Sequence, residues 1–274
     1  KLLYVSHLLV GAGVTTIDTA SFTVKSHVEL AEQPHDDTKT LPQGVVRGVY
    51  AVVPHPTTGV LWAPHLLLAV RTPEPALDFQ STVFPAVSTL DPTGAGEGAR
   101  LNFTPIDDTT HAGAFNDVVS GPRAIAFTPD GRLALVADGQ SEDVLVFDAK
   151  QQVEVGLVRP LPAAFLEGIT VDHQGRHAYV HGRNSQNVVV LALDADDALA
   201  PAAVDGAPIV TVAADPMPAN LRYGQRLFYT ANSADFPITK NFWVACSSCH
   251  LEGATDAVTW RFFVGPRDTP SNAG

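Results

Sequence analysis

The only two cysteines of this 274-residue chain stand three positions apart, and a histidine follows directly in CSSCH at 246–250. Three kinds of site use a CxxC pair: a dithiol redox pair, one half of a zinc site, and a covalent attachment site for haem c. A structural zinc site needs four ligands, and the chain has no second cysteine pair. A thioredoxin-like dithiol is expected in a βαβ context, which the surrounding sequence does not predict. The motif therefore favours haem, and we expect one covalently bound haem c.

The spacing of the motif suits covalent attachment. Positions i, i+3 and i+4 share one face of a helical turn, so Cys246 and Cys249 can each bond a vinyl group of the porphyrin while His250 binds the iron. A disulfide between the two cysteines would close a very small loop and constrain the unfolded chain little. Because haem held by two thioether bonds is not lost outside the cytoplasm, the motif favours a periplasmic, extracellular or cell-surface location.

Four further residues are candidates for contact with such a haem. Met217, the only methionine, is a candidate for the second axial ligand, although it precedes the CxxCH motif and could equally be a loop residue. Arg261 and Arg267 could pair with the propionates, or could form ordinary surface ion pairs. Trp260 could pack on the ring.

Two groups of histidines elsewhere in the chain are candidates for binding a metal. A carrier without a downstream methionine would need a distal histidine from the N-terminal part or from another chain, and the candidates are His55, His65 and His111. The second group lies close together and could form a metal cluster, but we interpret it as partly exposed strand and turn residues: His173, His177 and His181.

The segments that precede the motif are expected to be mainly β. Gly and Pro, 21 of each, are spread along the chain, with short segments rich in Val, Leu, Ile, Phe and Tyr between them. Stretches 122–150 and 166–195 align with each other, and Gly131 matches Gly175 at a spacing of 44 residues, as Ser141 matches Ser185. Each stretch predicts a strand, a tight glycine turn, a second strand, a polar turn and a third strand. A strand-rich repeat of about 40 to 45 residues is typical of β-propeller blades.

Two weaker copies lie upstream, at 2–24 and at 48–70, where a turn is expected at 57–59. The first copy, LLYVSH followed by TTIDTAS, resembles the YVTN-type propeller repeat. We therefore expect four blades in a domain at 1–212, as an incomplete propeller, since propellers of this type usually have seven. The insertion at 92–121 interrupts the repeat and is expected to be a long loop.

The pattern changes after residue 212, where Leu221, Leu227 and Phe228 have a helix-like spacing. We expect a second domain at 213–274, a small, partly α-helical cytochrome c module. Its GQRLFY, CSSCH, the Asp and Trp of ATDAVTW, and GPRDTPSNAG resemble, in that order, the first haem module of the bacterial dihaem cytochrome c peroxidase and MauG family. The resemblance covers about 60 residues.

The resemblance implies that Cys246 and Cys249 bind haem, that His250 is the proximal ligand, and that the segment 267–270 packs near it. The family carries a second CxxCH motif, and this chain has only one. Peroxidase-like oxidoreductase activity is therefore expected only if further sequence or a partner chain supplies a second haem.

Composition narrows the function classes. The formal net charge is −12 and the basic residues are scattered singly, which argues against nucleic acid as a partner and favours a basic redox partner. The longest apolar runs are broken by Pro and His, so no transmembrane segment is expected.

Two classes of function follow from the haem motif and the propeller repeat. The chain is a c-type cytochrome in electron transfer, or its propeller is a binding platform or structural subunit of an extracellular assembly and the haem serves as a relay.

Overall fold

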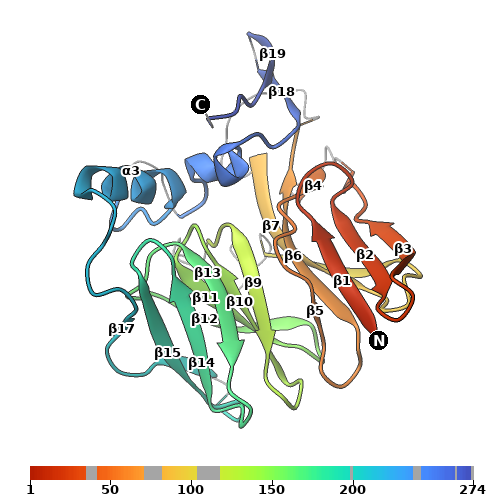
Figure 1. Ribbon diagram of the computed structural model, residues 1–274, viewed down its shortest axis with the longest axis horizontal. Coiled ribbons are helices and arrows are strands. Elements are labelled where there is room, and N and C mark those ends of the chain that lie inside the picture. The colour runs from red at the N-terminus through yellow and green to blue at the C-terminus, as the bar shows by residue number, and fades with distance from the viewer. Residues whose placement is uncertain are drawn as a thin grey trace. The chain divides into compact units, whose positions relative to one another are not determined.

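The structure of the chain, a computed structural model, describes residues 1–34, 42–70, 82–103, 118–197, 200–236, 242–262 and 264–272. Its elements are mainly antiparallel strands (Figure 1). The chain divides into two compact units. Unit 1 consists of Lys1–Pro54, Gly59–Ala112 and Cys246–Gly274, and unit 2 consists of His55–Thr58 and Gly113–Ala245.

Unit 2 contains the two sheets that the aligned stretches predict (Figure 1). Each sheet is an antiparallel meander, as expected for a propeller blade. The first consists of β9 (Pro122–Phe127), β10 (Leu133–Asp138), β11 (Asp143–Asp148) and β12 (Val153–Val158). The second consists of β13 (Leu166–Val171), β14 (His177–Gly182), β15 (Asn187–Leu193) and β16 (Ala202–Val204), and β17 (Ile209–Val210) also pairs with β15.

The two sheets repeat each other at the level of single hydrogen bonds. Gly131 and Gly175 both have a positive φ, of 74° and 71°, in equivalent hairpin turns, which confirms the predicted equivalence. The hydroxyl of Ser141 accepts a bond of 2.9 Å from the Ser120 N–H, and that of Ser185 accepts one of 2.8 Å from the Ala164 N–H. Serine therefore recurs because its oxygen satisfies a buried backbone donor at the start of each sheet.

One apolar cluster joins the sheets of unit 2. Strand β10 is buried along its whole length, and side chains from both sheets pack together. Burial of this contiguous surface is the main favourable term in the stability of the unit. The members of the cluster are Leu133, Leu135, Ala137, Val144, Val146, Val158, Leu161, Ala163, Leu166, Ala178, Val180, Val189 and Leu191.

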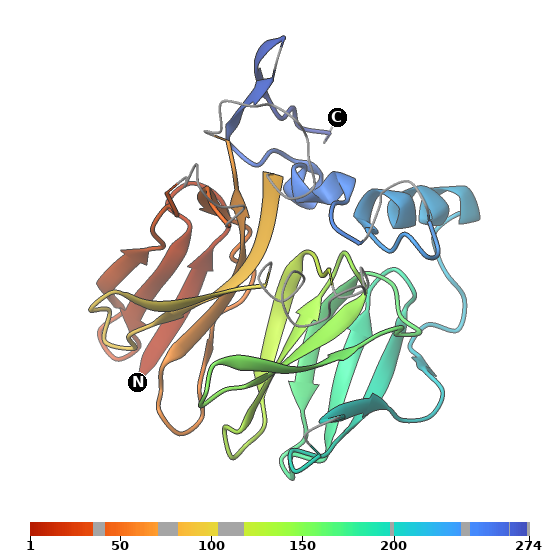
Figure 2. The ribbon, with the colours of Figure 1, turned by 180° about the vertical axis from the view of Figure 1, so that it is seen from behind.

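Among the described residues, unit 1 contains two larger sheets and the two-stranded sheet of its C-terminal hairpin. Strands β1 (Leu2–His7), β2 (Gly13–Asp18) and β3 (Thr23–Glu29) lie side by side in both ribbon views (Figures 1 and 2). The other larger sheet has the order β4 (Val45–Arg47), β6 (Leu61–Leu68), β7 (Val83–Leu90), β8 (Glu97–Asn102), and β5 (Val53–Pro54) also pairs with β6. Strands β6 and β7 are completely buried.

The segment 92–121 is not wholly the loop that the sequence predicts, because it contains β8. This strand pairs with β7, and its Glu97 and Arg100 form an ion pair with an N···O distance of 2.6 Å. Its Gly and charged residues hide the alternation that marks a strand. Residues 104–117 of the insertion lie outside the described residues.

The last part of the chain contributes to both units. Helix α3 (Ala219–Tyr229) confirms the helical spacing at Leu221, Leu227 and Phe228 and belongs to unit 2. The short helical turns η1 (Cys246–Ser248) and η2 (Leu251–Gly253) and the hairpin of β18 (Thr259–Phe262) and β19 (Gly265–Asp268) belong to unit 1. The domain boundary at residue 212 stays a prediction. Among the described residues, no helix has the length and apolar character needed to cross a membrane.

Candidate functional site

The CSSCH segment forms one tight helical turn. The backbone N–H of His250 donates to the carbonyl of Cys246 at 3.0 Å, which is the i to i+4 bond of an α-helical turn. Cys246 is exposed, whereas Cys249 and His250 are half-buried. Both cysteines are free thiols. Two thiols and one imidazole therefore come from a single turn, which is the donor set that covalent haem attachment requires.

The residues between the cysteines hold this turn in unit 1. Ser247 and Ser248 are 3% and 0% exposed, so their side of the turn faces the interior while Cys246 lies at the surface. The turn ends at η2, where Glu252 takes a left-handed conformation with a φ of 53°. This conformation is uncommon for a residue with a side chain and stops the helix directly after the histidine.

Burial determines the protonation state of the Cys249 thiol. Desolvation, with smaller contributions from Asp256 and Cys246, raises the pKa of Cys249 to about 12. The thiolate is disfavoured because burial removes water from it and because the nearby acidic groups oppose a further negative charge. Cys249 is thus a neutral thiol at physiological pH, and the exposed Cys246 is the more accessible sulfur.

A buried aspartate ties the C-terminal hairpin to the turn. Asp256 is 0% exposed, and its Oδ2 accepts hydrogen bonds of 2.7 Å from the indole Nε1 of Trp260 and 2.9 Å from the hydroxyl of Thr269. These are the Asp, the Trp and the Thr of the motifs quoted above, so their order along the sequence has a structural reason. They form one hydrogen-bonded cluster between η2 and the hairpin.

Arg47 on β4 holds the same segment from the other end of the sequence. Its Nε donates to the backbone oxygen of Asp256 at 2.8 Å, and its second amino group donates to that of Ala257 at 3.3 Å. Sequence reasoning missed this residue, because no local pattern links positions 209 residues apart.

The chain end returns to the segment that follows the histidine. The Asn272 N–H donates to the carbonyl of Gly253 at 2.8 Å, and the Gly253 N–H donates to that of His250 at 2.9 Å. Two successive backbone hydrogen bonds thus connect Asn272 to His250 of the CSSCH segment. The structure brings together, within unit 1, every segment of the C-terminal resemblance except GQRLFY, which lies in α3.

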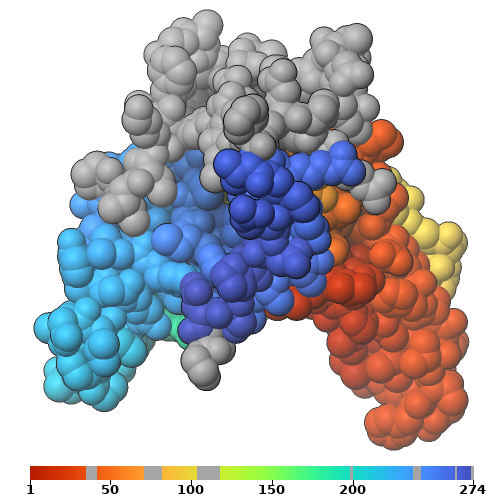
Figure 3. Space-filling view, turned by 90° about the horizontal axis from the view of Figure 1, so that it is seen from above, coloured from red at the N-terminus to blue at the C-terminus, as the bar shows by residue number. Residues whose placement is uncertain are grey.

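The other three candidates for contact with haem lie on the C-terminal hairpin, where one is buried and two are exposed. Trp260 is buried with its indole nitrogen bonded to Asp256, so it anchors the hairpin. Arg261 and Arg267 are exposed, and Trp260 pairs with Arg267 across the two strands. Val264 at the hairpin tip is 74% exposed, in keeping with the surface position of these last residues in Figure 3. A role of the two arginines toward propionates stays a prediction.

His55 is a structural residue of unit 2. Its Nε2 donates to the carbonyl of Gly131 at 2.9 Å, and its Nδ1 accepts from the Thr57 and Thr58 N–H groups at 3.3 Å. Both ring nitrogens are therefore engaged, and iron ligation by His55 would require these bonds to break.

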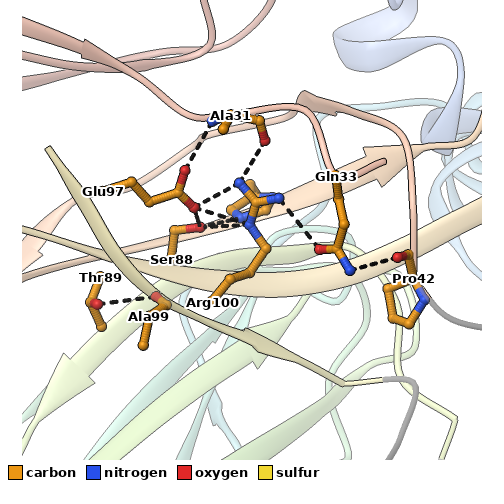
Figure 4. Close-up of polar contacts among 9 residues, drawn as sticks. Ala31, Gln33, Pro42, Ser88, Thr89, Glu97, Ala99 and Arg100 are labelled. Carbon is orange, nitrogen blue, oxygen red and sulfur yellow. Dashed lines mark hydrogen bonds and ion pairs between the residues drawn. The ribbon is translucent and has the colours of Figure 1, made fainter. Parts of the chain in front are cut away.

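His65 on β6 belongs to a polar network in unit 1. It is 0% exposed, and its Nε2 lies 2.9 Å from the Ser88 hydroxyl, which donates to Glu97 at 2.6 Å. Figure 4 shows how Arg100 joins Ser88 and Glu97 to the backbone of Ala31. Burial, with a contribution from Arg100, lowers the pKa of His65 to about 3. Its ring is neutral and enclosed.

The remaining candidates lie in unit 2 or outside the described residues, and ligation by any of them stays a prediction. His111 lies outside the described residues, and Met217 is a half-buried residue of unit 2 whose backbone N–H bonds Asp215 at 2.9 Å. His177 bonds Asp172 at 3.0 Å, and His173 is exposed in a turn. In the described part of the chain, no group of three or more His, Cys, Asp or Glu side chains is arranged to hold a metal ion.

Comparisons with known proteins bear on the fold. No protein-family model matches the chain, and no curated protein matches it significantly. The Kuenenia stuttgartiensis hydrazine synthase is similar in structure, with a TM-score of 0.53 and 17% identity over 68% of this chain and 53% of that one. A protein from Lactobacillus plantarum has a TM-score of 0.48 and 20% identity over 77% of this chain and 54% of that one. The chain spans about half the length of these structures. The likeness to hydrazine synthase and the antiparallel sheets support a β-propeller-like fold.

Proposed function

We propose that this chain is a c-type cytochrome that takes part in electron transfer. Cys246 and Cys249 hold one haem c through thioether bonds, and His250 is its proximal ligand. A bound haem would supply a one-electron redox centre. The observation that carries the proposal is the single turn that presents two free thiols and a half-buried imidazole, closed by the bond from the His250 N–H to the Cys246 carbonyl.

The surroundings of the turn support this assignment. Cys246 is exposed, so a porphyrin vinyl group can reach its sulfur. The buried Asp256, Trp260 and Thr269 fix the segment that follows the histidine, as an attachment site needs rigid support. In sequence they resemble motif residues of the dihaem cytochrome c peroxidase and MauG family, and the first blade resembles a YVTN repeat. On these resemblances we propose a propeller joined to a haem module of that family.

The same proposal sets expectations for partners and location. A net charge of −12 favours a basic redox partner, because opposite charges steer association. Covalent haem favours the periplasm or the cell surface. Peroxidase-like activity requires a second haem, from further sequence or from a partner chain, because the chain contains one CxxCH motif.

The proposal is tested by measuring whether the haem is covalently bound. The chain is expressed with a c-type haem maturation system and extracted with acidic acetone. We expect the haem to stay with the denatured protein and to give the pyridine haemochrome spectrum of a porphyrin with two thioether bonds. The Cys246→Ala/Cys249→Ala variant should release its haem completely, and each single variant should keep one thioether bond and show the corresponding spectral shift.

A matched control separates attachment from folding. Ser247→Ala changes a residue inside the same turn without removing a sulfur, and it should keep its haem. If acidic acetone extracts the haem from wild-type protein that circular dichroism showed to be folded before the extraction, the proposal is wrong.

A further inference from the structure

Two histidines on the β1–β3 sheet converge on one atom. The Nε2 of His7 on β1 lies 2.7 Å from the hydroxyl oxygen of Thr15 on β2, and the Nδ1 of His27 on β3 lies 2.9 Å from the same oxygen. The two ring centroids are 5.0 Å apart and the rings are nearly perpendicular, at 88°. Strands β1 and β3 thus each place one imidazole nitrogen within hydrogen-bond distance of the same hydroxyl oxygen on β2.

The register of the sheet explains the convergence. Thr15 pairs directly with His27, and His7 pairs with Gly13 two residues away on the same strand, so all three side chains lie on one face. His27 is exposed and His7 is half-buried. The convergence point is therefore at the surface, where an ion can arrive from solvent.

The donor chemistry of this pair selects a class of ion. Imidazole nitrogen suits Cu²⁺, Ni²⁺ and Zn²⁺, whereas Ca²⁺ and Mg²⁺ prefer oxygen ligands. Nearby charge does not oppose a cation, because Lys25 on β3 forms an ion pair with Asp18 at 3.7 Å and Glu29 stands two residues beyond His27 on the same face. With two protein ligands, the other positions of the ion would be filled by water.

We propose that His7 and His27 form a surface binding site for a divalent transition-metal ion, in which the two imidazole nitrogens that now contact the Thr15 hydroxyl bind the metal. The Thr15 hydroxyl, which donates to one ring and accepts an N–H from the other, is displaced from the point between them. The ring that donated its N–H binds the ion through that nitrogen in its other tautomer, with the proton on its second nitrogen. It would cross-link β1 to β3 over the top of β2. This site is separate from CSSCH and goes beyond the proposed haem function.

Copper(II) is the probe for the test, because its electron paramagnetic resonance spectrum counts nitrogen ligands. The full chain carries Cys246→Ala and Cys249→Ala in every sample, so that thiols do not contribute. We expect one equivalent of Cu²⁺ to bind with the superhyperfine pattern of two imidazole nitrogens. His7→Gln and His27→Gln should each reduce that pattern to one nitrogen and weaken binding roughly tenfold or more.

The matched control is His173→Gln, which removes an exposed histidine from a turn of unit 2. It should leave both the spectrum and the affinity unchanged. Circular dichroism checks that all variants are folded. A two-nitrogen spectrum that survives either His7→Gln or His27→Gln would overturn the proposal, as would the absence of stoichiometric Cu²⁺ binding to the folded parent chain.

Discussion

Asp138 and Asp143 lie directly opposite each other on β10 and β11, and both side chains are 0% exposed. Arg159 pairs with Oδ2 of Asp143, whereas neither carboxyl oxygen of Asp138 has a hydrogen-bond partner among the described residues. Burial, and then the charge of Asp143, raise the pKa of Asp138 well above its usual range, although Arg159 acts in the opposite direction. The charged form of Asp138 is therefore disfavoured in the folded protein.

This pair predicts that Asp138→Asn stabilises the protein. A group with a raised pKa in the folded state stabilises fully below its ordinary pKa, and the contribution is lost as the pH rises toward the folded value. Because the amide stays neutral, we expect the variant to gain about 1–2 kcal/mol in unfolding free energy at pH 8. Urea unfolding at pH 5 and pH 8 measures this. The control is Asp143→Asn, which weakens the buried pair with Arg159 and should destabilise by about 2 kcal/mol or more. A loss of stability in Asp138→Asn would contradict the interpretation.

The enclosed imidazole of His65 predicts a loss of stability in acid. Because burial lowers its pKa to about 3, the unfolded chain takes up a proton below about pH 6.5 that the folded protein does not. The resulting decline in unfolding free energy between pH 6.5 and pH 3 is on the order of 4 kcal/mol. His65→Gln should remove this part of the pH dependence, measured by urea unfolding at several pH values. His173→Gln, an exposed histidine, should not, and an identical slope for His65→Gln and wild type would count against the prediction.

The equivalent turns of unit 2 predict unequal costs for the same substitution. Gly131→Ala and Gly175→Ala both strain a positive φ, at about 1 kcal/mol each. A Cβ on Gly131 would also come within 2.4 Å of the His55 ring, whereas one on Gly175 would be 3.2 Å from Pro129. Gly131→Ala should therefore cost about 1–2 kcal/mol more in unfolding free energy. In the His55→Ala background this excess should disappear, and a double-mutant cycle that shows simple additivity would refute the explanation.

The cluster at Asp256 predicts how the C-terminal hairpin is held. Trp260→Phe keeps the ring but removes the donor to the buried carboxylate, so we expect a loss of about 1–2 kcal/mol and faster proteolysis of the hairpin. Limited proteolysis followed by mass spectrometry locates the cleavage. Val264→Ala at the exposed tip of the same hairpin should change neither quantity. Equal protection of the hairpin in Trp260→Phe and wild type would show that the hydrogen bond is unimportant.

Local patterns along the sequence were sufficient to predict three strands in each sheet of unit 2. Gly131 and Gly175 mark tight turns, and the alternating segments around them become β9 to β11 and β13 to β15 with the predicted order. The serines repeat because each satisfies a backbone donor at the same position of its sheet. Such signals are encoded within about ten residues of the element that they specify.

The roles of single polar residues could not be predicted in the same way. A buried histidine held by hydrogen bonds, such as His55 or His65, has the same sequence appearance as a metal ligand. Strand β8 was missed because the segment 92–121 interrupts the blade repeat and was therefore interpreted as a loop, and the ion pair between Glu97 and Arg100 within the strand is visible only in the structure. The bond from Arg47 to Asp256 joins distant parts of the chain, and only tertiary structure reveals it.

That last bond also constrains the order in which the protein can fold during synthesis. Unit 1 needs Cys246–Gly274 as well as its N-terminal segments, whereas nearly all of unit 2 comes from the stretch between them. Until residue 256 has left the ribosome, Arg47 cannot bond the carbonyl of Asp256. Contacts of such large sequence separation form slowly. The sheets of unit 2 can therefore assemble before unit 1 is complete, and the turn that carries CSSCH is fixed in unit 1 only after they have been made.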